Sequence, residues 1–124
     1  MPRVNKKNHK NSGQTALWLT KAYIEGLTPL MVAIRRGHTD IVKLLLTHPE
    51  IKVNLRDNNG KTALMHASIS GSYEMVSLLL EREDVEVDIK DKYGETALIH
   101  AIRGRNRNLI RVIRSKCVRQ RCEG

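Results

Sequence analysis

Two kinds of side chain that can do chemistry recur in this chain at one fixed interval. His66 and His100 lie 34 residues apart, and so do Asp57 and Asp91. Paired carboxylates can serve as general acid and base, and paired histidines can bind zinc. On equivalent helices of stacked units, however, two histidines would be about 8–10 Å apart, too far to share one zinc ion. We therefore expect half-exposed histidines, and aspartates that are present because turns favour them.

No other catalytic arrangement follows from the residue spacing. The serines have no nucleophile-elbow context, and the chain lacks a glycine-rich phosphate loop. Cys117 and Cys122 form no C-x-x-C motif, and five positions apart on a helix they would lie on different faces. We expect no enzyme activity, no metal and no cofactor. We also expect reduced thiols, in a cytoplasmic or nuclear protein.

The composition suits one globular domain with an aliphatic core. Of the 124 residues, 40% are hydrophobic and only 3% are aromatic. No apolar stretch approaches the roughly 20 residues of a membrane-spanning helix, and no apolar block of a secretory signal follows the basic N-terminus. The net charge of +9 comes from the two ends, because residues 1–11 carry +4, residues 12–100 carry −2 and residues 101–124 carry +7.

An internal repeat of 34 residues organises the chain. The sequence Thr-Pro-Leu-Met at 28–31 recurs as Thr-Ala-Leu-Met at 62–65 and as Thr-Ala-Leu-Ile at 96–99. Residues 28–61 and 62–95 are identical at 12 of 34 positions. Such self-similarity at a fixed period is the signature of a repeat architecture.

Each unit predicts two short helices and a turn. Thr28 can cap a helix that begins at Pro29, whose φ angle is already helical. Gly37 can end this helix in the left-handed conformation, and a second helix is expected over 39–47. Residues 57–60 have the composition of a turn. Helices this short are marginal alone, so their apolar faces must be buried against neighbouring units in an all-α, stacked solenoid.

The repeated motif resembles the ankyrin repeat over residues 26–114. The motif reads G-x-T-A/P-L-x-x-A and then G-x-x-x-x-V-x-x-L-L-L, with D-x-x-G before Thr62 and Thr96. The resemblance implies a binding module without catalysis. One departure concerns the histidine that the family carries three residues after the threonine, because Met31, Met65 and Ile99 occupy those positions. The His–Thr hydrogen bond of the family is then absent, and each repeat is expected to be less stable.

The repeat divides the chain into six segments. They are a basic tail at 1–11, a partial unit at 12–25, repeats at 26–59, 60–93 and 94–114, and a basic tail at 115–124. The partial unit can be a cap of the stack or a sign that the chain is a fragment of a longer array.

The last unit departs from the first two in ways that suit the end of a stack. Arg105 replaces the helix-ending glycine, so we expect the turn to shift onto Gly104. Arg114 replaces a leucine, so we expect a polar outer side that ends the array. The period also places an acidic segment beside this basic end, and part of the positive charge should be neutralised there. The acidic residues are Glu83, Asp84 and Glu86, and the basic residues are Lys116, Arg119 and Arg121.

The resemblance implies that a partner is held by the turn tips and by the exposed face of the first helix of each unit. Carried over position by position, this concave surface comprises Ile24, Glu25, Leu27, Arg35, Arg36, Asn58, Asn59, Lys61, Ile69, Ser70, Lys92, Tyr93, Glu95 and Arg103. Tyrosine and arginine are the residue types that most often anchor interfaces. Basic residues outnumber acidic ones on this surface, so the expected partner has an acidic or extended segment.

Three hypotheses for function remain open. The first is a monomeric, non-catalytic protein–protein interaction module that acts as a scaffold or adaptor. The second is binding of a polyanion, such as nucleic acid or acidic lipid, through the arginine-rich C-terminal end. That end carries no aromatic side chain on which a base could stack. The third is that the chain is a fragment of a longer repeat array.

Overall fold

The computed structural model describes residues 25–120, which form three helix pairs. The first helices of the pairs are α3 (Pro29–Arg35), α5 (Ala63–Ser70) and α7 (Ala97–Arg103). The second helices are α4 (Thr39–Leu46), α6 (Tyr73–Leu80) and α8 (Arg107–Arg119). No strand occurs among these described residues. The expected all-α stack of helix pairs is confirmed.

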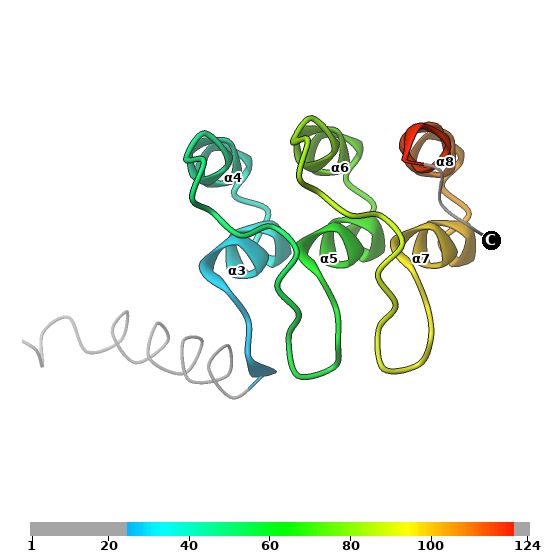
Figure 1. Cartoon of the computed structure of the whole chain (residues 1–124), viewed down its shortest axis with the longest axis horizontal. Coiled ribbons are helices and arrows are strands. Elements are labelled where there is room, and N and C mark those ends of the chain that lie inside the picture. The colour runs from blue at the N-terminus through cyan, green and yellow to red at the C-terminus, as the bar shows by residue number, and fades with distance from the viewer. Residues whose placement is uncertain (1–24, 121–124) are drawn as a thin grey trace, which may run out of the picture.

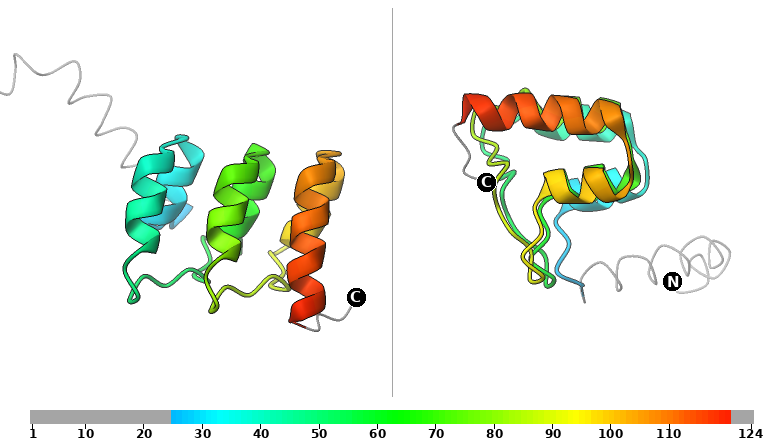
Figure 2. Two further views of the ribbon diagram at one scale, coloured as in Figure 1. Left: turned by 90° about the horizontal axis from the view of Figure 1, so that it is seen from above. Right: turned by 90° about the vertical axis from the view of Figure 1, so that its right-hand side faces the viewer.

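The helices form two layers. The first helices lie side by side in one row, and the second helices lie in a row above them (Figure 1). The long turns between repeats project away from both rows on one side of the molecule (Figures 1 and 2). Each helix pair therefore contacts only its neighbours, as in other repeat solenoids.

A threonine begins each of the first helices. The hydroxyl oxygens of Thr28, Thr62 and Thr96 accept the backbone N–H three residues later, at 3.2, 3.3 and 3.3 Å. Each cap satisfies one N–H that the helix itself leaves unpaired. The backbone N–H of Thr28 also lies 3.5 Å from the sulfur of Met31. A methionine at the family's histidine position is thus compatible with a closed cap.

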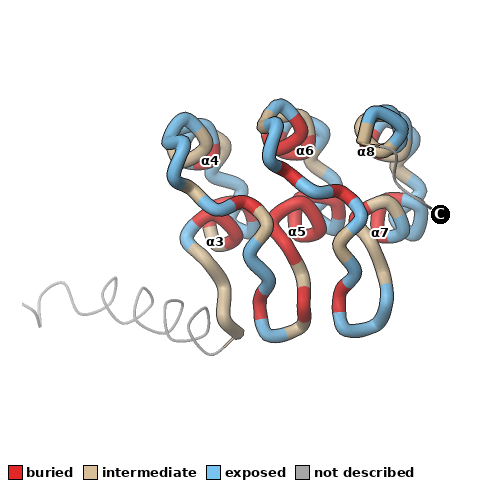
Figure 3. The backbone as a smooth tube through the Cα atoms, viewed as in Figure 1, coloured by how far each residue is buried: buried red, intermediate tan, exposed pale blue. Residues whose placement is uncertain are grey.

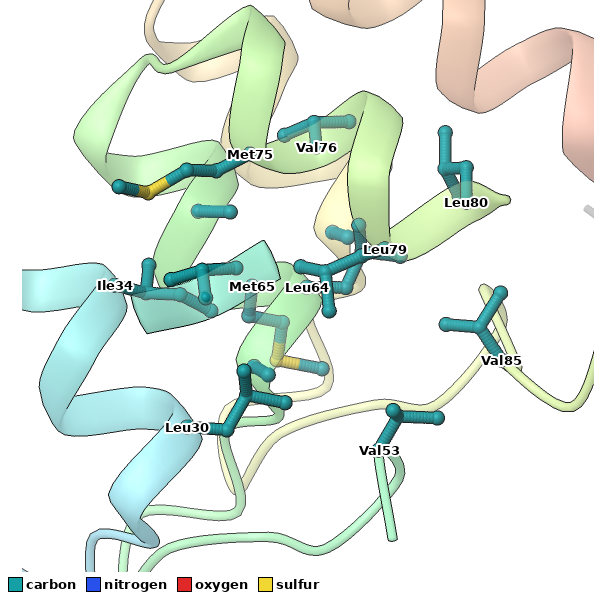
Figure 4. Packing of buried hydrophobic residues seen from close by; sticks show 14 of the residues in the cluster. Leu30, Ile34, Val53, Leu64, Met65, Met75, Val76, Leu79, Leu80 and Val85 are labelled. Carbon is teal, nitrogen blue, oxygen red and sulfur yellow. The ribbon is translucent and has the colours of Figure 1, made fainter. Parts of the chain in front are cut away.

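Aliphatic side chains from both layers fill the core. Met31 and Met65 are buried among them. Figure 4 shows side chains of α3, α5 and α6 meeting between the layers, and Val53 and Val85 approach them from the inter-repeat segments. The buried positions follow the inner sides of the helices and recur from repeat to repeat (Figure 3). Burial of one repeat against the next therefore holds the short helices in place.

The turn between α7 and α8 differs from the expectation. Arg105 itself adopts the left-handed conformation at φ 56°, whereas Gly104 stays right-handed at φ −77°, so the predicted shift onto Gly104 was wrong. The reason is a hydrogen bond of the helix end. With Arg105 left-handed, the N–H of Asn106 reaches the carbonyl of Ala101 at 3.2 Å, as in the glycine-containing turns of the first two repeats.

Replacing Arg105 by glycine is expected to stabilise the fold by about 1 kcal/mol, because a side chain in the left-handed region costs roughly that much. The urea unfolding midpoint measures the gain. Arg105→Ala removes the same charge but keeps Cβ, so it should give no such gain. Equal midpoints for the two variants would contradict the assignment of strain to this residue.

Helix α8 is longer than expected. It continues to Arg119, so residues 115–119 are helical rather than part of a tail. Gln120 then ties the helix end to the second repeat, because its amide donates to the carbonyl of Val85 at 2.6 Å and accepts from the N–H of Val87 at 3.3 Å. Residues 1–24 and 121–124 lie outside the described part of the chain. The predictions for the N-terminal tail, for nearly all of the partial unit, for Arg121 and for Cys122 concern these residues.

The expected neutralisation of the basic end is not found. Among residues 25–120, no ion pair joins the acidic segment to Lys116 or Arg119. Asp84 is bound at 2.8 Å by Arg82, a neighbour in sequence. Lys116 Nζ lies 3.5 Å from the carbonyl oxygen of Arg82, so the two segments are adjacent although their charges do not pair.

Candidate functional site

The inter-repeat turns form a connected row. The N–H of Asn58 donates to the carbonyl of Glu25 at 2.9 Å, and the N–H of Lys92 donates to the carbonyl of Asn59 at 3.0 Å. Gly60 sits where the turns come closest, since a Cβ there would lie 2.9 Å from the backbone nitrogen of Lys92. The turn tips and the first helices are thus held as one continuous surface.

An aspartate organises the turn between the first two repeats. Oδ1 of Asp57 accepts the backbone N–H groups of Asn59 and Lys61 at 2.8 and 2.9 Å. Its Oδ2 accepts from Nε2 of His66 at 2.9 Å. One carboxylate therefore shapes the turn and fastens it to α5, the first helix of the second repeat.

The next turn repeats this arrangement. Oδ1 of Asp91 accepts the N–H groups of Tyr93 and Glu95, both at 2.9 Å, and Oδ2 accepts from Nε2 of His100 at 3.0 Å. The exposed fractions of His66 and His100 are only 7% and 9%, so the expectation of half-exposed histidines was wrong. The common separation of nine residues between each aspartate and its histidine is the sequence signal that could have revealed both pairs.

Burial and hydrogen bonding set the charges of these groups. Burial lowers the pKa of His66 below 6.5, and the hydrogen bond with Asp57 offsets only part of this effect. Neutral His66 donates its Nε2–H to the carboxylate. Burial by itself would raise the pKa of Asp91, but hydrogen bonds from Glu95, His100 and Tyr93 bring it below 3.8. The turn around Asp91 is therefore built on an ionised carboxylate.

One cluster in the last turn has the residue types of a metal site. Asp91, Glu95 and His100 offer ligand atoms within 4.8 Å of one another. The negative charge of the two carboxylates is already balanced by cations of the protein. Lys61 Nζ lies 3.7 Å from Asp91, and Arg103 pairs with Glu95 at 3.0 Å. The arrangement fits a structural network.

The apolar anchors of the expected surface are exposed. The exposed fraction of Ile69 is 53% and that of Tyr93 is 68%. Ile69 lies at the end of α5, and the equivalent positions in the first and third repeats are Arg35 and Arg103. An exposed isoleucine thus stands between two arginines, one repeat away on each side.

The charged residues of this surface are largely engaged with one another. Arg35 pairs with Glu25 at 2.9 Å, and Arg103 pairs with Glu95. The ammonium groups of Lys61 and Lys92 lie 5.5 and 5.2 Å from the centre of the Tyr93 ring, within the range of cation–π attraction. From the sequence, these charges were expected to be available to a partner. Because they are already paired, the surface offers mainly its apolar groups.

The remaining expected positions fall on the same turns and helix ends, except one. Ile24 lies outside the described residues. Leu27 and Asn59 are half-buried, whereas Arg36, Asn58 and Ser70 are exposed. Arg36 directly follows α3, Ser70 is the last residue of α5, and Asn58 lies at the tip of its turn.

Arg82, which links the second repeat to the first, was not among the residues expected from the sequence. Its guanidinium donates to four backbone carbonyls just after α4 and to the carboxylate of Asp84 at 2.8 Å. The carbonyls belong to Leu46, His48, Pro49 and Ile51, at 3.0 to 3.3 Å. A cation at the same position of the 34-residue period in two repeats, Arg82 and Lys116, was the available signal.

A family model of ankyrin repeats, in three copies, matches residues 3–91 and 52–122. The chain belongs to the ankyrin-repeat family. Human (Homo sapiens) Rabankyrin-5 is 50% identical over 36 residues, and mouse (Mus musculus) Rabankyrin-5 is 47% identical over 36 residues. Each match covers 29% of this chain and 3% of the relative, so the likeness is confined to about one repeat.

Membership of the ankyrin-repeat family carries a general function. Ankyrin repeats are generally protein-interaction modules, and members of the family are typically scaffolds without catalysis. None of the helices within residues 25–120 is long and apolar enough to cross a membrane.

Proposed function

We propose that this ankyrin-repeat chain acts as a scaffold or adaptor that holds a protein partner on its concave surface, as defined above by the turn tips and the first helices. The observation that carries the proposal is the exposure of Ile69 and Tyr93 on a rigidly connected row of turns and helix ends. Exposed apolar and aromatic groups with arginines nearby are typical of the residues that anchor interfaces.

The pairing of charges refines the kind of partner. The ion pairs Arg35–Glu25 and Arg103–Glu95 alternate with Ile69 along the row. An extended segment crossing the repeats would place an apolar side chain near Ile69 or Tyr93. The polar groups of that segment would then compete for the charged side chains of the ion pairs on either side. Exposed pairs of this kind are worth only about 0–1 kcal/mol each, so a partner can displace them at low cost.

Capture from cell lysate tests this proposal. The double variant Ile69→Asp/Tyr93→Ala should lose proteins that the wild-type chain retains, by about tenfold in amount, because each change removes an exposed anchor. Ile41→Asp is the matched control, since Ile41 is an exposed isoleucine on α4. The circular dichroism spectra of both variants must match the spectrum of the wild-type chain. Retention of the same proteins in equal amounts by all three chains would contradict the role of the concave surface.

A further inference from the structure

The end of the stack formed by α7 and α8 presents a different surface, whose defining residues are not shared with the concave one. We define the third-repeat outer face by its apolar residues Ile99, Ile102 and Ile110 and its basic residues Arg107, Arg111 and Arg114. Figure 1 shows the two helices at one end of the row, with no described helix beyond them.

The apolar part of this face is exposed at positions that other repeats bury. The exposed fractions of Ile99 and Ile102 are 37% and 47%, whereas Met65 and Ser68, one period earlier, are buried. The equivalent face of the second repeat is covered by the third repeat, because α7 packs against α5 and α8 packs against α6. The expectation of a polar outer side is therefore wrong for α7. Helices cover the equivalent face in both preceding repeats, so its shape suits a helix.

The basic part of this face consists of three exposed arginines. Among the described residues, no ion pair involves Arg107, Arg111 or Arg114. The chain has no acidic residue between Thr96 and Arg119. The three arginines line a shallow groove along α8 together with the half-buried Ile110. A ligand bound here would contact the three arginines along α8 and, beside them, the apolar side chains of this face.

We propose that the third-repeat outer face binds an amphipathic helix of a protein partner, whose apolar side chains cover the isoleucines and whose carboxylates pair with the arginines. The isoleucines favour this occupant over nucleic acid, because phosphate contacts leave apolar side chains uncovered. The face also has no aromatic ring on which a base could stack. This surface is separate from the concave one, so its test is independent of the proposed function.

Selection from a displayed library of single-helix peptides tests the proposal. Peptides selected on the full chain should carry carboxylates three or four positions apart beside leucine or isoleucine. Their affinity, measured by fluorescence anisotropy, should fall by about tenfold or more for Arg111→Glu/Arg114→Glu and for Ile99→Ser/Ile102→Ser. The concave variant Ile69→Asp/Tyr93→Ala should bind them as the wild-type chain does.

The matched control is Lys52→Glu/Lys90→Glu. Both lysines are exposed, and this double reversal lowers the net charge from +9 to +5, as the arginine double reversal does. Affinity within twofold of wild type is expected for it. Selected peptides without carboxylates, or equal losses in both double reversals, would overturn the proposal. So would an absence of helical binders accompanied by arginine-dependent binding to single-stranded RNA or to phosphatidylserine vesicles.

Discussion

Asp91→Ala is expected to lower the free energy of unfolding by about 3 kcal/mol. The substitution leaves the N–H groups of Tyr93 and Glu95 without their acceptor and removes the partner of buried His100. It also removes the carboxylate that lies 3.7 Å from Lys61, the contact that reaches across to the preceding turn. Urea unfolding followed by far-UV circular dichroism measures the loss.

Asp88→Ala is the matched control for this change. Asp88 is an exposed aspartate of the same inter-repeat segment, so its loss should alter stability by no more than about 0.5 kcal/mol. Asp91→Asn keeps an oxygen acceptor for the turn but loses the charge, and an intermediate value is expected. If Asp91→Ala and Asp88→Ala had the same stability, the aspartate would not organise the turn.

Arg82→Ala is expected to lower the free energy of unfolding by about 2 kcal/mol. The guanidinium donates to four carbonyls of the preceding repeat, and hydrogen bonds from a charged donor are stronger than neutral ones. The estimate is well below the sum of the separate bonds, because water can reach several of these carbonyls once the side chain is removed.

Two variants separate this role from a general effect of charge. Arg82→Lys retains the positive charge but not the planar fork, so it should recover only part of the loss. Arg111→Ala removes an exposed arginine that makes no ion pair, and a change within about 0.5 kcal/mol is expected. Full recovery by lysine would mean that charge alone, and not the shared hydrogen bonds, links the repeats.

The repeat and the helix ends could be predicted from sequence because they depend on neighbours in the chain. Thr28, followed by Pro29, caps a helix through a hydrogen bond to a residue close in sequence. Gly37 ends that helix because it can adopt the left-handed conformation. The 34-residue period then supplies the stacking, because short amphipathic helices have no other way to bury their apolar sides.

The parts that sequence reasoning missed depend on contacts that the period does not specify. Arg105 takes a costly conformation because the helix-end hydrogen bonds outweigh the preference for Gly104. His66 is buried because the turn folds back onto α5 and brings Asp57 to it. The ion pairs of Arg35 and Arg103 were not predicted from the sequence, because it is the folded turns that bring Glu25 and Glu95 close to them.

The three repeats form one packed body that presents its turns and its outer face as fixed surfaces. Urea unfolding of the wild-type chain by far-UV circular dichroism, at two protein concentrations about tenfold apart, tests this claim most directly. The predicted result is one cooperative transition whose midpoint is the same at both concentrations. A shallow loss of helix without a cooperative transition, or a midpoint that rises with protein concentration, would contradict the claim.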